Sequence, residues 1–171
     1  PEYQNTLFDL LMRQGKDLGI KLFGSRALRS LSLEKGYGTW AYEYRPTFSP
    51  IEAGLEKFVA FDKGDFIGRD ALIKERDKGT EKRLVLLRVD AVDADVINDE
   101  PIWHNNRVVS YVTSGGYGHF IKQSLALSYL PIALVDDPSL NAFEIEIMGQ
   151  RCPAKIHYEI PFDPKGERMR S

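Results

Sequence analysis

The sequence predicts an α+β protein in which a mostly helical first half precedes a small antiparallel β-barrel. Before residue 80, apolar residues recur mainly at helical spacing. Beyond it, "RLVLLRVD" (83–90) and "FEIEIMGQRCPAKIHYEI" (143–160) alternate apolar and polar residues at period two, as strands do. The charged stretch "RDKGTEKR" separates the two patterns. We therefore place a boundary near residue 80 and expect one domain segment over 1–80 and a second over 81–171.

The first half contains three predicted helices. Apolar periodicity predicts the first within residues 2–20 and the second within 24–36, between a possible Ser25 N-cap and Gly36 at the C′ position. A third, "IGRDALIKERDKG", ends at Gly79. Between the last two, an aromatic and proline-interrupted loop is expected to lead into a strand over "LEKFVAFD" (55–62).

The second half carries hairpin signals. A polar turn at 104–106 separates the apolar runs of "PIWHNNRVVSYVTSG", and "MGQR" (148–151) is a similar turn. Several short strands in roughly 80 residues are typical of a small antiparallel barrel or sandwich.

Composition argues against several classes of protein. The net charge of −2 is spread over interspersed acidic and basic residues, which disfavours nucleic acid and anionic membranes as partners. One cysteine and three histidines provide no spaced zinc-ligand set, so we expect Cys152 to be a buried free thiol and no metal to be bound. No segment approaches the ~20 apolar residues of a membrane span, and no signal peptide is evident.

The glycines of "TSGGYGHFIKQSLALSYLP" (113–131) raise the possibility of a phosphate-binding loop. Such a loop needs a helix after its glycines, so that backbone N–H groups face the anion. Here "SLALSYLP" alternates and ends at Pro131, which is typical of a strand, and neither GxGxxG nor GxxxxGK[ST] occurs. We therefore expect a glycine-rich bend or bulge that joins two strands.

No catalytic constellation is evident. Glu34, Glu43 and Glu52 are candidate general acids or bases, but the expectation for each is a solvated charge at a helix end or in a loop. His104 in a predicted turn and His157 in a predicted strand lack a Ser or Cys nucleophile in a recognisable signature, so no triad is inferred.

Six motifs in order resemble the C-terminal part of the folate-dependent aminomethyltransferase family. This family includes the glycine-cleavage T-protein and the C-terminal half of the flavin-linked sarcosine and dimethylglycine dehydrogenases. The motifs "SLSLEKGY", "SPIEAGL" and "PFDP" are most similar to sarcosine dehydrogenase. The six motifs are "SLSLEKGYGTW" (30–40), "RPTFSPIEAGL" (45–55), "DFIGRDAL" (65–72), "RLVLLRVD" (83–90), the 113–131 stretch and "IPFDPKGERM" (160–169).

The resemblance implies that residues 1–80 are the tail of a folate-binding α/β domain and that 81–171 are the family's C-terminal β-barrel. The family's catalytic Asp and a folate-contacting Glu would then precede Pro1, as would an FAD domain. The chain alone is expected to contain no catalytic residue and to be inactive. The parent polypeptide would oxidise a small N-methylated amino acid and pass the one-carbon unit to tetrahydrofolate, in the cytoplasm or, in a eukaryote, in the mitochondrial matrix.

Three family positions that contact folate fall in this chain with altered identities. Leu28 stands where the T-protein has an Arg, with Arg29 next to it, and the dehydrogenase branch shares this departure. Lys57 replaces an aromatic residue, and its ammonium could pair with the glutamate tail of folate. Glu167 replaces a Tyr. Two alternatives remain: a non-enzymatic regulatory or interaction domain of dehydrogenase-like architecture, or part of a stand-alone T-protein that partners a lipoyl carrier.

Overall fold

The structure, a computed structural model, describes residues 2–170. Its helices are α1 (Gln4–Gln14), α2 (Ser25–Glu34), α3 (Arg69–Lys78) and the short α4 (Ile132–Val135). Single 3₁₀ turns lie at Lys16–Leu18, Glu56–Phe58, Pro138–Leu140 and Glu167–Met169. The strands are β1 (Lys82–Val89), β2 (Pro101–His104), β3 (Arg107–Tyr111), β4 (Ser114–Gly118), β5 (Gln123–Pro131), β6 (Phe143–Ile147) and β7 (Gln150–Ile156).

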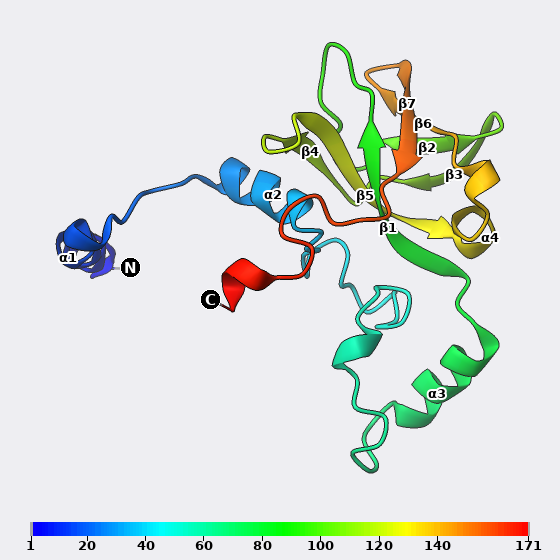
Figure 1. The fold of residues 1–171 in the computed structure, drawn as a ribbon, viewed down its shortest axis with the longest axis horizontal. Helices are drawn as coiled ribbons and strands as arrows, with labels where there is room; N and C mark the ends of the chain where they lie inside the picture. Colours follow the sequence, from blue (N-terminus) through cyan, green and yellow to red (C-terminus); the bar gives the residue numbers. More distant parts are fainter. Residues whose placement is uncertain (1, 171) are drawn as a thin grey trace.

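The seven strands form one antiparallel sheet in the order β3-β2-β6-β7-β1-β5-β4. The sheet curls, so that β3 at one edge comes back towards β5 (Figure 1). Ser110 of β3 donates to the carbonyl of Tyr129 at 2.7 Å, and its Oγ lies 3.0 Å from that of Ser128. The predicted α+β fold with a barrel-like second half is thus confirmed, as a half-barrel.

Apolar residues on both faces of β1 and β5 are buried. Inside the curl, Val85 and Leu87 of β1 pack with Ala126 and Leu130 of β5 in the main apolar core. The opposite face carries a smaller cluster, in which Leu33 of α2 packs on the leucines at positions 86, 125 and 127. The helix α2 therefore docks on the outside of the sheet.

The helices α1 and α3 lie away from the sheet (Figure 1). Neither contains a buried residue. In α1, the face predicted from apolar periodicity exists, but Leu7, Leu10 and Leu11 are all exposed. The apolar spacing thus predicts the helix correctly, but none of the described residues packs against its apolar face to bury it.

Some local predictions are confirmed and others are wrong. All three helices form, and Gly36, at φ +65°, follows the C-cap of α2 as predicted. Ser25 is the first helical residue, because Gly24 occupies the N-cap. The strand predicted over 55–62 is wrong: a 3₁₀ turn occupies Glu56–Phe58, and no strand among residues 2–170 pairs with it.

The glycines of the 113–131 stretch lie inside β4 and do not form the expected bend between strands. The strand β5 follows them where a phosphate loop would need a helix. Their small size permits close packing instead. A Cβ at Gly115 would stand 2.8 Å from the Val96 carbonyl oxygen, and one at Gly118 would stand 3.0 Å from Oε1 of Glu34. The glycines therefore allow the Val96 backbone and the Glu34 side chain to pack directly against β4.

Candidate functional site

Two adjoining hollows flank the loop that follows α2, and Tyr37 lines both. The first has a volume of about 360 Å³ and lies between α2, that loop and β4. The second, of about 590 Å³, lies between the same loop, residues 53–58 and the C-terminal segment 160–170. In Figure 1 this last segment, coloured red, runs back to α2.

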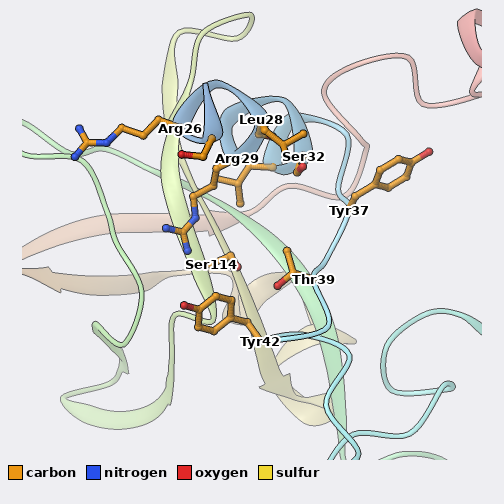
Figure 2. Close-up of a pocket in the computed structure, with 10 residues that line it drawn as sticks. Arg26, Leu28, Arg29, Ser32, Tyr37, Thr39, Tyr42 and Ser114 are labelled. Atoms are coloured by element: carbon orange, nitrogen blue, oxygen red, sulfur yellow. Dashed lines mark hydrogen bonds between the residues drawn. The ribbon is translucent and has the colours of Figure 1, made fainter. Parts of the chain in front are cut away.

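Helix α2 forms one wall of the first hollow, and the polar residues Thr39, Tyr42 and Ser114 also line it. Figure 2 shows Arg29 reaching from α2 towards Tyr42 and Ser114, while Arg26 and Tyr37 point outward. The Arg29 guanidinium donates to Oδ1 of Asn98 at 2.6 Å and lies 5.8 Å from the centre of the Tyr42 ring. Oγ of Ser114 is buried, and the described residues offer it no hydrogen-bond partner. A buried hydroxyl without a partner favours a ligand that supplies one.

The second hollow combines cations with aromatic walls. Tyr37, Tyr44 and Phe58 supply the rings, and no carboxylate is present among the described residues that line it. Four basic residues line it: Lys35, Lys57, Lys165 and Arg170. In a chain whose net charge is −2, this is a local excess of positive charge.

One of these cations is already neutralised. Nζ of Lys35 lies 3.0 Å from Oδ2 of Asp163 and also donates to that residue's carbonyl. The Lys35 hydrogen bond lowers the pKa of Asp163 below its ordinary value, so the aspartate is ionised at neutral pH. Arg170 donates to the carbonyls of Lys165 and Gly166, which leaves part of its five-donor guanidinium for other acceptors. The unneutralised charge therefore resides on Lys57, Lys165 and Arg170.

Glu34 holds the walls of both hollows together. It is 3% exposed, which corrects the expectation of a solvated charge. Its Oε1 accepts from the backbone N–H groups of Phe120 at 2.6 Å and Ile121 at 3.1 Å, in the turn after β4. Its carbonyl accepts from Phe162 N at 3.0 Å. One residue of α2 thus fixes both the sheet and the C-terminal segment.

The other two glutamates also have structural contacts. Glu43 is fully buried, which again corrects the expectation. Its Oε2 accepts from Thr39 N at 2.8 Å, while its Oε1 has no partner within residues 2–170. Glu52 is half-buried and exchanges two 3.1 Å hydrogen bonds with Ser49, in the manner of a capping box.

His104 and Cys152 both lie in strands of the sheet. His104 is the last residue of β2 and not part of a turn, which corrects the turn predicted over 104–106, and its Nε2 lies 3.1 Å from the Leu140 carbonyl oxygen. Cys152 is a buried free thiol, as predicted. Within residues 2–170, no cluster of His, Cys, Asp and Glu could hold a metal ion.

The three family positions lie on these hollows or at their rim. Leu28, half exposed on α2, lines the first hollow. Lys57 lines the second, with its ammonium 5.1 Å from the centre of the Phe58 ring. Glu167 begins the C-terminal 3₁₀ turn directly after Gly166, which also lines the second hollow.

Sequence reasoning missed other residues of the site. Ser114 lies in the glycine stretch, which was assigned only a structural role, and Lys165 and Arg170 lie more than a hundred residues beyond Lys57. The one available signal was the basic composition of "PKGERMR", because a run of cations beside a folate-related motif indicates anion binding.

Two family models match this chain. The model described as "GCVT N-terminal domain" matches residues 1–63, and the "Glycine cleavage T-protein C-terminal barrel domain" matches residues 82–163. The chain belongs to the glycine-cleavage T-protein family. A solved structure of this family, aminomethyltransferase T of the glycine cleavage system from Bartonella henselae, has the same fold at a TM-score of 0.79 and 24% identity. The match covers 93% of this chain and 43% of that one.

The similar proteins also include two mitochondrial dehydrogenases. Human mitochondrial dimethylglycine dehydrogenase is 40% identical over 90% of this chain, and mouse mitochondrial sarcosine dehydrogenase is 33% identical over 96%. In both cases the match covers 18% of the relative, so the chain spans about a fifth of the length of these proteins. None of the helices in residues 2–170 combines the length and apolar character of a membrane span.

Proposed function

We propose that this chain is the C-terminal folate-binding region of an enzyme that oxidises an N-methylated amino acid and passes the one-carbon unit to tetrahydrofolate. The proposed substrate class is sarcosine or dimethylglycine. Flavin is assigned to another part of the parent, because the described residues contain no glycine-rich turn that opens a helix. The two named dehydrogenase relatives are mitochondrial, which favours the mitochondrial matrix for a eukaryotic parent.

One observation carries the proposal. Three positions that resemblance assigns to folate are far apart in the sequence. Leu28 and Lys57 nevertheless line two hollows that share Tyr37, and Glu167 directly follows Gly166, which lines the second. The chemistry of the hollows fits the ligand. Aromatic rings suit the planar parts of folate, cations suit its carboxylates, and the buried Ser114 hydroxyl requires a polar partner.

The described residues would act by positioning. Tetrahydrofolate supplies the nitrogen atoms that capture the one-carbon unit. Residues of this chain would hold it in one orientation, because binding in a fixed geometry removes much of the entropic barrier to a reaction between two molecules. Apolar walls such as Leu28 and Leu33 would exclude water, which otherwise releases the unit as formaldehyde.

The test uses the complete parent polypeptide supplied with its amine substrate. Formaldehyde release is measured with and without saturating tetrahydrofolate, and release should fall when folate is present. Leu28→Trp fills the first hollow and should weaken tetrahydrofolate binding at least tenfold, measured by calorimetry. Leu31→Trp is the matched control, because Leu31 is similarly exposed on the same helix but does not line either hollow. It should retain the folate effect.

Either of two results would contradict the proposal. Folate could fail to bind the parent at millimolar concentration, in which case the altered identities at Leu28, Lys57 and Glu167 mark a site without its ligand and the regulatory alternative replaces the enzyme. Alternatively, Leu28→Trp and Leu31→Trp could bind tetrahydrofolate equally well, which would place the folate outside the first hollow.

A further inference from the structure

We infer that a third hollow, beside the first, binds the small N-methylated amino acid as a zwitterion, with its carboxylate on Arg26 and Arg29 and its charged nitrogen facing Asp95. This hollow, of about 480 Å³, lies between α2, residues 95–97 and β4. The inference rests on the proposed function for the identity of the amino acid. It adds a binding site that neither the family models nor the three mapped positions assign.

Arg29 stands at the boundary between this hollow and the first, because its side chain lines both. Its guanidinium donates to Oδ1 of Asn98 at 2.6 Å, and the same oxygen accepts from Gly115 N at 3.3 Å. Asn98 therefore orients the guanidinium without neutralising it. A guanidinium has five N–H donors, so the charge and most of the donors of Arg29 remain for an anion.

Arg26 adds a second positive charge three residues earlier on α2, and it also lines both hollows. Like charges at this spacing on a helix repel each other, and an anion bound at both relieves the repulsion. Neither guanidinium forms an ion pair with a carboxylate of residues 2–170. Two such groups favour a carboxylate ligand, because the planar donor fork of Arg matches the two oxygens of a carboxylate.

The third hollow also contains groups that suit a methylated cation. Asp95 is exposed in its lining, and its Oδ1 accepts from Ser124 Oγ, which leaves Oδ2 for another donor. The Tyr117 ring lines the same hollow, with the His119 ring edge-on to it at 5.1 Å. Methylated ammonium groups bind favourably against aromatic rings, so Tyr117 and Asp95 together favour a cationic nitrogen that carries methyl groups.

This combination of charges distinguishes a zwitterion from simpler ligands. A compact anion such as phosphate would be repelled by Asp95, and a simple amine would be repelled by the two guanidinium groups. An amino acid places one charge of each sign a few atoms apart and satisfies both. Because Arg29 also lines the first hollow, a carboxylate bound to it lies beside the hollow proposed for tetrahydrofolate.

The experiment titrates the chain itself with two probes of the same shape, dimethylglycine and 3-methylbutanoate. The second has a carbon where the first has its charged nitrogen. Binding is followed from the amide chemical shifts of Gly115, Gly116 and Tyr117, which line the third hollow. Dimethylglycine should bind about two- to fivefold more tightly than 3-methylbutanoate, because that is the worth of one exposed ion pair.

Substitutions at the two ends of the site should have different effects. Asp95→Asn should remove the preference for dimethylglycine without weakening 3-methylbutanoate. Arg29→Gln, and independently Arg26→Gln, should weaken both probes by about two- to fivefold. The matched controls are Asp93→Asn and Arg107→Gln, at exposed residues outside the lining, and both should bind the probes as the unaltered chain does.

The inference is overturned if dimethylglycine at about 100 mM shifts none of the three amides. It is also overturned if the two probes bind equally well, or if Asp95→Asn keeps the preference. None of these measurements contains folate, so each of these results leaves the proposed function to its own test. If dimethylglycine binds as expected while the parent fails to bind folate, the amino-acid site stands and the proposed function falls.

Discussion

The region from Lys82 to Ile156 buries its own apolar residues, whereas the region before residue 80 leaves most of its own exposed. With the exception of Leu33, every buried apolar residue lies at or beyond Val85. The first region presents Leu7, Phe23 and Trp40 to solvent with at least half of each side chain exposed. The sheet therefore has an apolar core of its own, whereas the stability of the helical region depends on its contacts with other segments.

Specific hydrogen bonds join the two regions, in addition to the apolar packing of Leu33 on the sheet. Ser30 donates to the Tyr117 carbonyl at 2.6 Å, and Glu34 binds the turn after β4. The Tyr129 hydroxyl donates to the Glu43 carbonyl at 2.8 Å, while its ring stacks on Phe48 at 3.7 Å. The candidate site lies along this junction, where the site's shape depends on a small number of hydrogen bonds.

The largest expected difference compares two leucines. Leu87→Ala opens a cavity in the fully buried core and should lower the free energy of unfolding by about 2–5 kcal/mol. Leu11→Ala, on the exposed face of α1, should change it by about 0.5 kcal/mol or less. Urea denaturation of the chain, followed by circular dichroism, measures both. Equal losses would show that α1 is packed in solution and that the comparison is wrong.

A smaller effect is expected at the junction. Glu34→Gln keeps an acceptor oxygen for Phe120 N and Ile121 N but removes the charge that strengthens both bonds. The free energy of unfolding should fall by about 1–2 kcal/mol. Glu52→Gln, whose side-chain hydrogen bonds are with the nearby Ser49, is the control and should cost about 0.5 kcal/mol. A loss at Glu52 as large as that at Glu34 would contradict the assignment of Glu34 as the link between regions.

Tyr129→Phe tests the second contact of the junction. The ring can still stack on Phe48, but the Glu43 carbonyl loses its donor, so unfolding should become easier by about 1 kcal/mol. Burial raises the pKa of the Tyr129 hydroxyl well above its ordinary value, so the donor stays protonated throughout the neutral range. The effect should therefore be the same at pH 6 and pH 9. A loss that disappears at pH 9 would disprove this account of the hydroxyl.

The smallest effect concerns pH. Burial and the nearby Arg88 lower the pKa of His157, so the unfolded chain binds this proton more readily than the folded one. Stability should accordingly fall as the pH drops from about 7 through the ordinary histidine pKa of about 6.5 towards the lowered value. His157→Gln should flatten that slope in thermal denaturation, and the exposed His119→Gln should not. An unchanged slope in His157→Gln would exclude His157 as its source.

The periodicity of apolar residues predicted most of the helices and strands but few residues of the candidate site. Period-two alternation identified the strands around Leu87, Ile145 and Cys152, and the helical spacing identified α2. The strand predicted near Lys57 failed because a strand requires a pairing partner, which alternation alone does not reveal. Similarly, Glu34 resembled a helix-end charge because its acceptor contacts lie 86 and 87 residues away in sequence.

The folate assignment came from resemblance, and the residues themselves could not have supplied it. Lys57 and Lys165 do not belong to one sequence motif. Ser114 lies in a stretch whose glycines are accounted for by the close packing of neighbouring segments, so the stretch gave no sign of a binding site. Only the folded chain brings the cations of 53–58 and 160–170 to one hollow.

Hydrogen exchange of the complete parent, with and without saturating tetrahydrofolate, tests the central claim most directly. Amides at the loop after α2, at 53–58 and at 160–170 line or border the hollows and should exchange at least several-fold more slowly with ligand. Amides of β1 and β6, which lie in the self-sufficient sheet, should be unchanged. If folate binds but protects none of those three segments, the hollows at the junction do not form the folate site.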